Sequence, residues 1–254
     1  MSVPLFLAER ERLLSGDRVH LSGAEGRHAS AARRLTAGER IDLTDGAGLL
    51  AECVVTSVGG DGLEAEVRSR SEHSAPAPRL TVVQALAKGD RGERAVEMMT
   101  EAGVDVVVPW AASRCITRWE GARGEKSLAR WRGKAREAAK QSRRVFLPEV
   151  DALATTKTVS ETLSKAALGV VLDSDANVRL AEAAQASGSH VGEGAVAAGG
   201  IVVVIGPEGG VTPEELDAFD SAGAVAARLG PTVLRTSTAG VAAIAVLSAH
   251  CGRW

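Results

Sequence analysis

The sequence contains no tyrosine, three phenylalanines, four tryptophans and three cysteines among 254 residues. With so few aromatic residues, a sheet that stacks several RNA bases on exposed rings is not expected. Cys53, Cys115 and Cys251 are far apart and odd in number, which argues against a disulfide scaffold or a zinc site. No segment approaches the roughly 18 consecutive apolar residues that a membrane-spanning helix needs. We therefore expect no metal and no membrane segment, in a reducing, cytoplasmic compartment.

The remaining composition is that of an ordinary globular protein. The only apolar run near the start, residues 3–8, is short and follows no basic segment, so a signal peptide is not expected. Hydrophobic residues make up 45% of the chain, enough for two domains with buried cores. The five histidines are dispersed, and no Ser/His/Asp or Cys/His arrangement emerges.

The formal net charge of −2 conceals an uneven distribution. Residues 1–144 hold 24 Lys and Arg against 20 Asp and Glu, whereas residues 145–254 hold 6 against 12. The concentration is sharpest over residues 114–144, with eleven basic and three acidic side chains. Such a block indicates a polyanionic partner, and the alternative is a solvated helix face in an arginine-rich protein.

The chain divides into a β-rich part and an α/β part. Within residues 1–72, alternating segments over 40–44, 49–58 and 63–68 are separated by Asp-Gly and Gly-Gly pairs, which are hairpin signals. Residues 73–79 carry two prolines and predict a linker. In residues 80–254 strand-like runs alternate with longer helical stretches, which predicts a largely parallel sheet with crossover helices.

Several elements of this second part can be placed from their pattern. Helices are expected over 90–102, 126–143, 178–186, 213–222 and 237–250, strands over 80–86, 104–108, 169–172, 201–205 and 224–229, and a loop over 187–200. The last helix is so apolar that it must be central to the domain or lie in a subunit interface.

Two glycine-bearing loops stand out. The run Ile201–Ile205 breaks into Gly206-Pro-Glu-Gly-Gly210 before a helix start at Thr212-Pro-Glu-Glu215, and Leu229-Gly-Pro-Thr-Val-Leu-Arg-Thr236 follows the next strand-like run. Open α/β sheets bind ligands at such strand-to-helix turns, because the backbone can approach closely and expose N–H groups. The first loop matches neither the P-loop nor the GxGxxG spacing, and alone it would be simple turn chemistry.

Together with other segments in the same order, these loops resemble the RsmE family of ribosomal RNA uridine N3-methyltransferases over nearly the whole chain. The supporting residues are Arg130-Trp131, Glu137-Ala138, Gln141-Ser142 and Arg144, His28, Arg34-Leu35, Gly38, Asp45-Gly46 and Gly48, and Lys88-Gly-Asp90, Thr100-Glu101 and Gly103-Val104.

The resemblance implies a PUA-like β-barrel that touches RNA, followed by a SPOUT methyltransferase domain with a deep trefoil knot. It also implies S-adenosylmethionine as the cofactor and a homodimer. Periodicity alone predicts a doubly wound, Rossmann-like sheet, so the knot depends on the resemblance. Three residues depart from the family pattern: Leu5 replaces an arginine, Met98 a lysine and Ser237 a glutamate. A mechanism that needs a carboxylate at position 237 is therefore excluded.

The resemblance and the backbone-rich loops together suggest a cofactor site. Its expected residues are Leu172, Gly206, Pro207, Glu208, Gly209, Gly210, Leu229, Gly230, Leu234, Arg235, Thr236, Thr238 and Ala239. The leucines could flank the adenine, while the glycines allow close approach.

Arg235 and Glu208 are the expected catalytic residues. Proton loss from N3 of uracil could be assisted by a nearby cation, the role expected of Arg235. A structural ion pair or a bond to a loop carbonyl is the alternative. Glu208 could bond a ribose hydroxyl or a loop N–H, or simply be a carboxylate favoured near a helix N-terminus.

The expected RNA-binding residues are Arg34, Arg114, Arg132, Arg136, Lys140 and Arg144. Steps of four residues place the last four on one helix face. The expected substrate is 16S ribosomal RNA within an assembled small subunit. Two alternatives stay open: ribose 2′-O-methylation by the same fold, and a non-catalytic RNA-binding factor.

Overall fold

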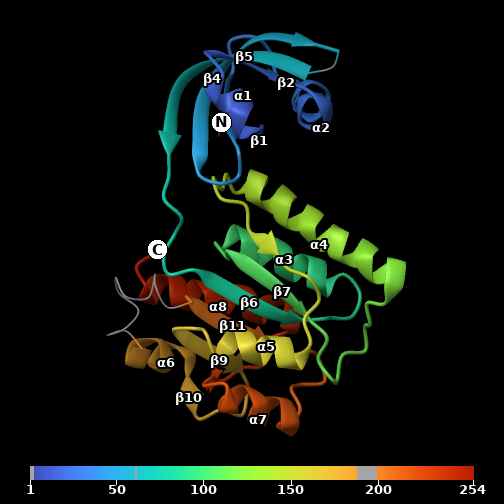
Figure 1. Cartoon of the computed structure of the whole chain (residues 1–254), viewed down its shortest axis with the longest axis vertical. Helices are drawn as coiled ribbons and strands as arrows, with labels where there is room; N and C mark the ends of the chain where they lie inside the picture. Colours follow the sequence, from blue (N-terminus) through green and yellow to red (C-terminus); the bar gives the residue numbers. More distant parts are fainter. Residues whose placement is uncertain (1–2, 61, 188–198) are drawn as a thin grey trace. The chain divides into compact units, whose positions relative to one another are not determined.

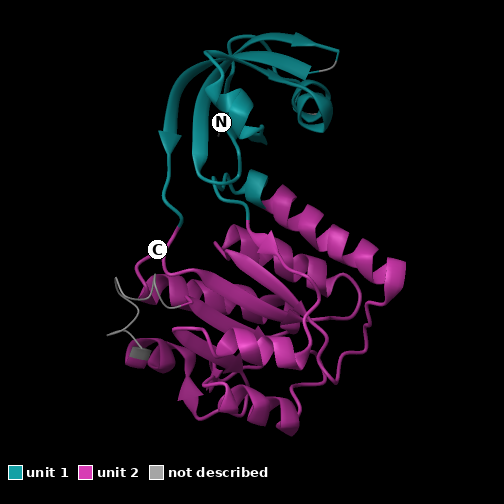
Figure 2. Ribbon diagram, in the orientation of Figure 1, with its two compact units in different colours: residues 1–75, 139–147 teal, residues 76–138, 148–254 magenta. Residues whose placement is uncertain are grey.

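The computed structural model describes residues 3–60, 62–187 and 199–254. The chain forms two compact units, one of residues 1–75 and 139–147, the other of residues 76–138 and 148–254 (Figure 2). The sequence-based division into a domain of residues 1–72, a linker of residues 73–79 and a domain of residues 80–254 stays a prediction. The structure adds residues 139–147 to the first unit.

The first unit is built on a five-stranded sheet with the order β1-β3-β4-β5-β2, in which only β1 and β3 are parallel. Alternation along β4 places Leu49, Ala51, Cys53 and Val55 in its core. Its elements are β1 (Leu5–Leu7), α1 (Arg10–Leu14), β2 (Arg18–Leu21), α2 (Gly23–Arg27), a π-helical turn (His28–Ala32), β3 (Arg40–Thr44), β4 (Leu49–Gly59) and β5 (Gly62–Glu72).

Residues 139–147 belong to this unit because they bond to the turn between β3 and β4. The N–H of Leu147 donates to the carbonyl of Gly46 at 2.9 Å, and the N–H of Gly48 donates to the carbonyl of Val145 at 3.3 Å. Strand β5 also runs on to Glu72, so the predicted strand end at residue 68 was too early.

The second unit alternates strands and helices, as the pattern predicted (Figure 1). The helix expected over 178–186 begins only at Leu180, because Val178 and Arg179 pair with β12. The loop expected over 187–200 lies almost wholly outside the described residues. The elements are β6 (Leu80–Ala85), α3 (Arg91–Glu101), β7 (Val106–Trp110), α4 (Gly121–Gln141, whose end belongs to the first unit), β8 (Glu149–Val150), α5 (Thr156–Leu163), β9 (Leu168–Leu172), β10 (Val178–Arg179), α6 (Leu180–Ser187), β11 (Ile201–Ile205), α7 (Pro213–Ser221), β12 (Val225–Arg228) and α8 (Thr236–His250).

The seven strands are parallel and lie in the order β10-β12-β9-β11-β6-β7-β8. All five residues of β11 are buried, as expected for a strand covered on both faces of a parallel sheet. Although β12 follows β11 in the chain, it pairs with the far side of β9. This order brings the carboxyl ends of β9, β11 and β12 to one edge of the sheet.

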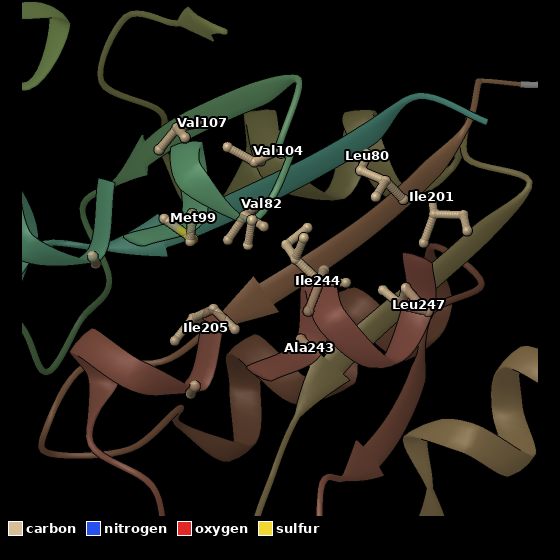
Figure 3. Packing of buried hydrophobic residues seen from close by; sticks show 14 of the residues in the cluster. Leu80, Val82, Met99, Val104, Val107, Ile201, Ile205, Ala243, Ile244 and Leu247 are labelled. Carbon is tan, nitrogen blue, oxygen red and sulfur yellow. The ribbon is translucent and has the colours of Figure 1, made fainter. Parts of the chain in front are cut away.

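Helices bury both faces of the sheet. On one face Val82, Met99 and Ile244, from β6, α3 and α8, are fully buried together (Figure 3). On the other face Val204 packs in the same core as Phe219 of α7. Burying each such large side chain contributes about 1.5–3 kcal/mol. The apolar helix α8 is therefore central to the domain, which was one of its two predicted positions.

Candidate functional site

A cavity of about 730 Å³ opens at the carboxyl ends of β9, β11 and β12. The loops that follow these three strands line it, together with the start of α8. Ligands bind open parallel sheets at this position, because the crevice beyond the strand ends exposes backbone groups. The structure thus brings together the two glycine-bearing loops that are well separated in the sequence.

The first loop, between β11 and α7, is held by close packing and by a helix cap. A Cβ on Gly206 would lie 2.8 Å from Cγ2 of Val211, and Gly210 has a φ of +75°, which favours glycine. The Thr212 hydroxyl accepts a hydrogen bond from the N–H of Glu215 at 3.2 Å, and the Glu215 carboxylate accepts one from the N–H of Thr212 at 3.0 Å. This capping box confirms the helix start predicted from the sequence.

The second loop, between β12 and α8, carries apolar side chains along the cavity. Val233 is 82% exposed and Leu234 is 38% exposed, and both line the cavity. Thr236, the first residue of α8, is buried. Its hydroxyl donates to the carbonyl of Gly206 at 3.0 Å and accepts from Nε2 of Gln84 at 2.9 Å. Two hydrogen bonds therefore connect both loops to β6.

Glu208 lies at the cavity wall in an ion pair. Its Oε1 is 2.8 Å from Nη1 of Arg91 and accepts a weaker bond from the N–H of Lys88 at 3.3 Å. Partial burial raises the pKa of Glu208, but hydrogen bonds from its own N–H, from Arg91 and from Lys88 lower the pKa overall. A carboxylate with a lowered pKa is a poor proton acceptor, so the geometry favours a positioning role for Glu208 over a role as base.

Arg235 precedes α8 as its N-cap, with its side chain exposed and lining the cavity. Its carbonyl accepts from the N–H groups of Thr238 and Ala239, each at 2.9 Å. Within residues 3–60, 62–187 and 199–254 the guanidinium has neither the ion pair nor the carbonyl bond that the structural alternative requires. Ser237, which departs from the family's glutamate, is buried beside it.

Arg114 forms another part of the wall. Its Nη1 donates to the carbonyl of Gly209 at 3.1 Å and to that of Val211 at 3.5 Å. Its neighbour Ser113 is held by the buried carboxylate of Glu215, which accepts from the Ser113 N–H at 2.8 Å and from the hydroxyl at 2.9 Å. Arg114 therefore supports the first loop from the cavity side.

Most of the predicted cofactor residues share this one cavity. Gly209 and Thr238 do not line it: Gly209 turns its carbonyl to Arg114, and the hydroxyl of Thr238 bonds to the carbonyl of Arg235 at 3.2 Å. Cofactor contact stays a prediction for the whole set. The residues that line the cavity are Leu172, Gly206, Pro207, Glu208, Gly210, Leu229, Gly230, Leu234, Arg235, Thr236 and Ala239.

Sequence reasoning missed four residues of the site. Arg91 lines the cavity, and Gln84 anchors Thr236 from the buried strand β6. Asp173 and Asp175 follow β9 in a turn in which Oδ1 of Asp173 accepts from the N–H of Asp175 at 3.0 Å. The two carboxylates come directly after a predicted strand end, which was a usable signal. Nothing in the sequence indicated the anchoring role of Gln84.

Helix α4 presents part of the predicted basic face. Arg132 and Arg136 are exposed, and Nε of Arg132 donates to the carbonyl of Val150 at 3.0 Å. Lys140 is different, because its Nζ lies 2.7 Å from the Glu25 carboxylate and only 16% of its side chain is exposed. Its charge is neutralised within the first unit, which argues against phosphate binding by Lys140.

Arg144 does not continue this face. Helix α4 ends at Gln141, and Arg143 has a φ of +57°, so the four-residue spacing no longer applies at Arg144. The predicted helix end at residue 143 was therefore too late. Arg34, in the first unit, is exposed with a φ of +52°. RNA contact by either arginine stays a prediction.

Two features are absent from the described part of the chain, a metal-ligand cluster and a membrane-spanning helix. It contains no cluster of three or more His, Cys, Asp or Glu side chains that could hold a metal ion. None of its helices is both long enough and apolar enough to cross a bilayer.

Comparisons with known proteins agree with this architecture. An RNA methyltransferase domain model matches residues 74–248, and an RNA methyltransferase PUA domain model matches residues 21–68. Ribosomal RNA small subunit methyltransferase E from Mycobacterium tuberculosis is 44% identical, covering 92% of this chain and 87% of the relative. The protein of that name from Bacillus subtilis is 26% identical, with 90% and 88% covered.

A solved structure shows the same fold. It is that of ribosomal RNA small subunit methyltransferase E from Neisseria gonorrhoeae, bound to S-adenosyl methionine, with a TM-score of 0.80, 29% identity and 98% of each chain covered. The predicted fold class, an α/β SPOUT methyltransferase domain behind a PUA-like domain, is confirmed. Because a family model covers most of the chain and a relative is 44% identical over 92% of it, the chain belongs to the RsmE family of ribosomal RNA small subunit methyltransferases.

Proposed function

We propose that this chain is an S-adenosylmethionine-dependent methyltransferase that methylates N3 of a uridine in 16S ribosomal RNA. The observation that carries the proposal is the position of Arg235 at a cavity walled by two glycine-bearing loops. Its guanidinium has no protein partner among the described residues, so it is available to a ligand.

The residues present fit the predicted cofactor. A cavity of about 730 Å³ is within the size range of small-molecule sites. A Cβ at Gly206 would intrude on the loop, which keeps its backbone open to close approach. Apolar Leu172, Leu229 and Leu234 line the same space and could flank an adenine. The relative bound to S-adenosyl methionine supports this assignment. S-adenosylmethionine supplies a methyl group already activated on a sulfonium.

The protein's task is to bind the cofactor, to align its methyl group with N3 of the base and to assist loss of the N3 proton. N3 of uracil is protonated at neutral pH, so forming the N–CH₃ bond would break the bond between the methyl group and the cofactor's sulfur and would release the N3 proton to solvent. A guanidinium beside the base stabilises the deprotonated ring, which is the role of Arg235. The ion pair between Arg91 and Glu208 fixes the first loop and keeps Glu208 ionised.

The substrate must offer an unpaired base. The N3 atom lies on the Watson–Crick edge, and exposing it costs least where the nucleotide is already unpaired. We infer an assembled small subunit as the substrate and the cytoplasm as the place of action. The exposed arginines of α4 would contact phosphates.

We also propose a homodimer. Helix α8 carries four half-buried apolar residues, Val241, Ala242, Ala245 and Val246, of which Val241 and Val246 pack at the edge of the core. A second copy of the chain would cover these apolar side chains. Sedimentation equilibrium should give twice the monomer mass of 26.2 kDa, and a monomer at all concentrations would contradict this part.

Nucleoside analysis tests the reaction. Small subunits from cells lacking the protein are incubated with the purified chain and labelled S-adenosylmethionine, and the digested RNA is examined by mass spectrometry. The expected product is 3-methyluridine, formed far more slowly when Arg235→Ala protein is used. A ribose-methylated nucleoside would support the 2′-O alternative. Absence of methylation together with no cofactor binding by calorimetry would leave a non-catalytic RNA-binding factor.

A further inference from the structure

A second cavity, of about 340 Å³, lies beside the first within the same unit. Two chain segments contribute to both: Arg91 and Arg114 line the first cavity, whereas Gly92 and Ile116 line the second. Successive Cα atoms are about 3.8 Å apart, so only one or two residues of chain separate the two spaces. Its volume lies at the lower end of the range for ligand sites.

Three arginines and one carboxylate give this cavity a positive charge. Arg118, Arg123 and Arg130 line it, and Nε of Arg130 lies 3.2 Å from the carboxylate of Glu93. In the part of the chain that the structure describes, Arg118 and Arg123 have no ion pair with the protein. Two unneutralised guanidinium groups at one cavity suit a phosphate-bearing ligand.

The same cavity also offers an apolar surface against which a base could pack. Trp119 meets Trp131 edge to face, with ring centroids 5.0 Å apart and planes at 82°. Trp131 is buried while Trp119 is half-buried, so the accessible indole is that of Trp119. Ile116 is 75% exposed beside it. Aromatic and apolar side chains next to arginines are typical of sites that stack single-stranded bases.

The walls of this cavity are fixed before any ligand binds. The hydroxyl of Thr117 donates to the carbonyl of Ala87 at 2.9 Å, which ties its two segments together. The indole of Trp131 packs directly on glycine backbone, since a Cβ on Gly92 would lie 2.4 Å from its Cζ2. The backbone of Trp119 lies close to Gly124, where an added Cβ would lie 2.8 Å from the carbonyl carbon of Trp119. A rigid wall reduces the ordering entropy that a ligand has to overcome.

We infer that this second cavity binds a nucleotide of the RNA strand next to the target uridine, with its phosphate on Arg118 and Arg123 and its base against Trp119 and Ile116. The inference deepens the proposed function and rests on it, because an RNA strand must pass the first cavity. One of the four tryptophans, Trp119, would then contact RNA with the buried Trp131 behind it, although the sequence offers no broad stacking platform.

Binding of a short oligouridylate, followed by tryptophan fluorescence and by anisotropy of a labelled strand, tests the site. We expect the oligouridylate to quench the tryptophan fluorescence of the wild type. In Trp119→Phe this quenching should disappear, while the anisotropy shows that the strand is still bound. The double variant Arg118→Ala/Arg123→Ala should bind about tenfold more weakly, with a salt slope flatter by about 1.4. Ile116→Ser, an exposed substitution that does not threaten folding, should weaken binding severalfold.

Arg179→Ala is the matched control, since Arg179 is 65% exposed in the same unit and lines neither cavity. Binding by the double variant equal to that of this control would overturn the inference. The methylation assay separates the two proposals. With small subunits, the double variant should raise KM about tenfold with kcat and cofactor affinity unchanged. If the wild type methylates and the double variant matches it, only this inference fails; if the wild type transfers no methyl group, the proposed function fails.

Discussion

The hydroxyl of Thr236 donates a hydrogen bond to the carbonyl oxygen of Gly206 at 3.0 Å, across 30 residues of sequence. The same hydroxyl accepts from Gln84, whose side chain is fully buried in β6. One small polar group thus fixes the spacing of the two loops that wall the cavity. Removing one partner of such a buried hydrogen bond is costly, because the polar groups left behind stay buried with fewer hydrogen bonds to offset the loss of water.

Thr236→Val removes that hydroxyl with little change of volume. Among the described residues it leaves Nε2 of Gln84 with only its 3.2 Å bond to the carbonyl of Ala85, and the carbonyl of Gly206 loses the hydrogen bond from position 236. We expect a loss of about 1–3 kcal/mol in the free energy of unfolding, measured by urea denaturation, and weaker cofactor binding by calorimetry. Thr238→Val is the control for the stability measurement, because among the described residues its hydroxyl bonds only to the carbonyl of Arg235 within its own turn. Equal effects of both variants would contradict the role of Thr236.

Arg235→Ala removes the cation proposed to assist proton loss. We expect single-turnover methyl transfer to fall by about 10²-fold or more, with cofactor affinity changed less than about threefold. Arg235→Lys keeps the charge but not the planar fork and should be intermediate. Parallel losses of transfer and cofactor affinity would remove the catalytic role.

Glu208→Gln tests the ion pair with Arg91. The folded-state pKa of Glu208 is lowered from 4.5, so ionisation stabilises the fold above pH 4.5, and this contribution is lost as the pH falls through the lowered value. At pH 7 the variant should be less stable by at most about 1 kcal/mol, because the pair is partly exposed. The difference from the wild type should fade in acid. A difference that grows below pH 4.5 would show that the sign is wrong.

The pair also predicts a kinetic result. If Glu208 positions the loop through Arg91, then Arg91→Gln and Glu208→Gln should slow methyl transfer to a similar extent, and the double variant should be little worse than either. A far larger effect of Glu208→Gln alone would instead assign the carboxylate a direct part in proton transfer. Fixed-time assays of methyl transfer to small subunits, run at one pH, distinguish these outcomes.

Gly206→Ala should disturb the site more than the fold. The added Cβ would meet Cγ2 of Val211 at 2.8 Å, so Val211 or the loop must shift. We expect cofactor affinity to fall about tenfold, with at most about 1–3 kcal/mol lost in stability. Gly133→Ala, on an open stretch of α4, is the control and should stabilise the helix slightly. Unchanged cofactor binding by Gly206→Ala would place the cofactor away from this loop.

The sequence predicted local structure well where one strong local preference acts. Thr212, Pro213 and Glu215 specified the start of α7, because all three act within four residues of sequence. The Thr212 side chain caps the helix, the Pro213 ring fixes a helical φ, and the Glu215 carboxylate bonds back to the N–H of Thr212. The sequence-based prediction failed where contact with a distant segment of the chain determines the local structure. Val178 and Arg179 follow a helical pattern but extend along β12, and the turn between β3 and β4 holds residues 145–147 from far along the chain.

By itself the sequence determined the alternation of strands and helices, the two glycine-bearing loops and, through its resemblance, the family. Periodicity and turn chemistry are short-range properties, and they are written in neighbouring residues. Only the tertiary structure decided that Gln84 anchors Thr236, that Arg91 pairs with Glu208 and that Lys140 is neutralised by Glu25. These contacts follow from the strand order and the packing of helices, because a side chain's partner across the fold has no periodic signature in sequence.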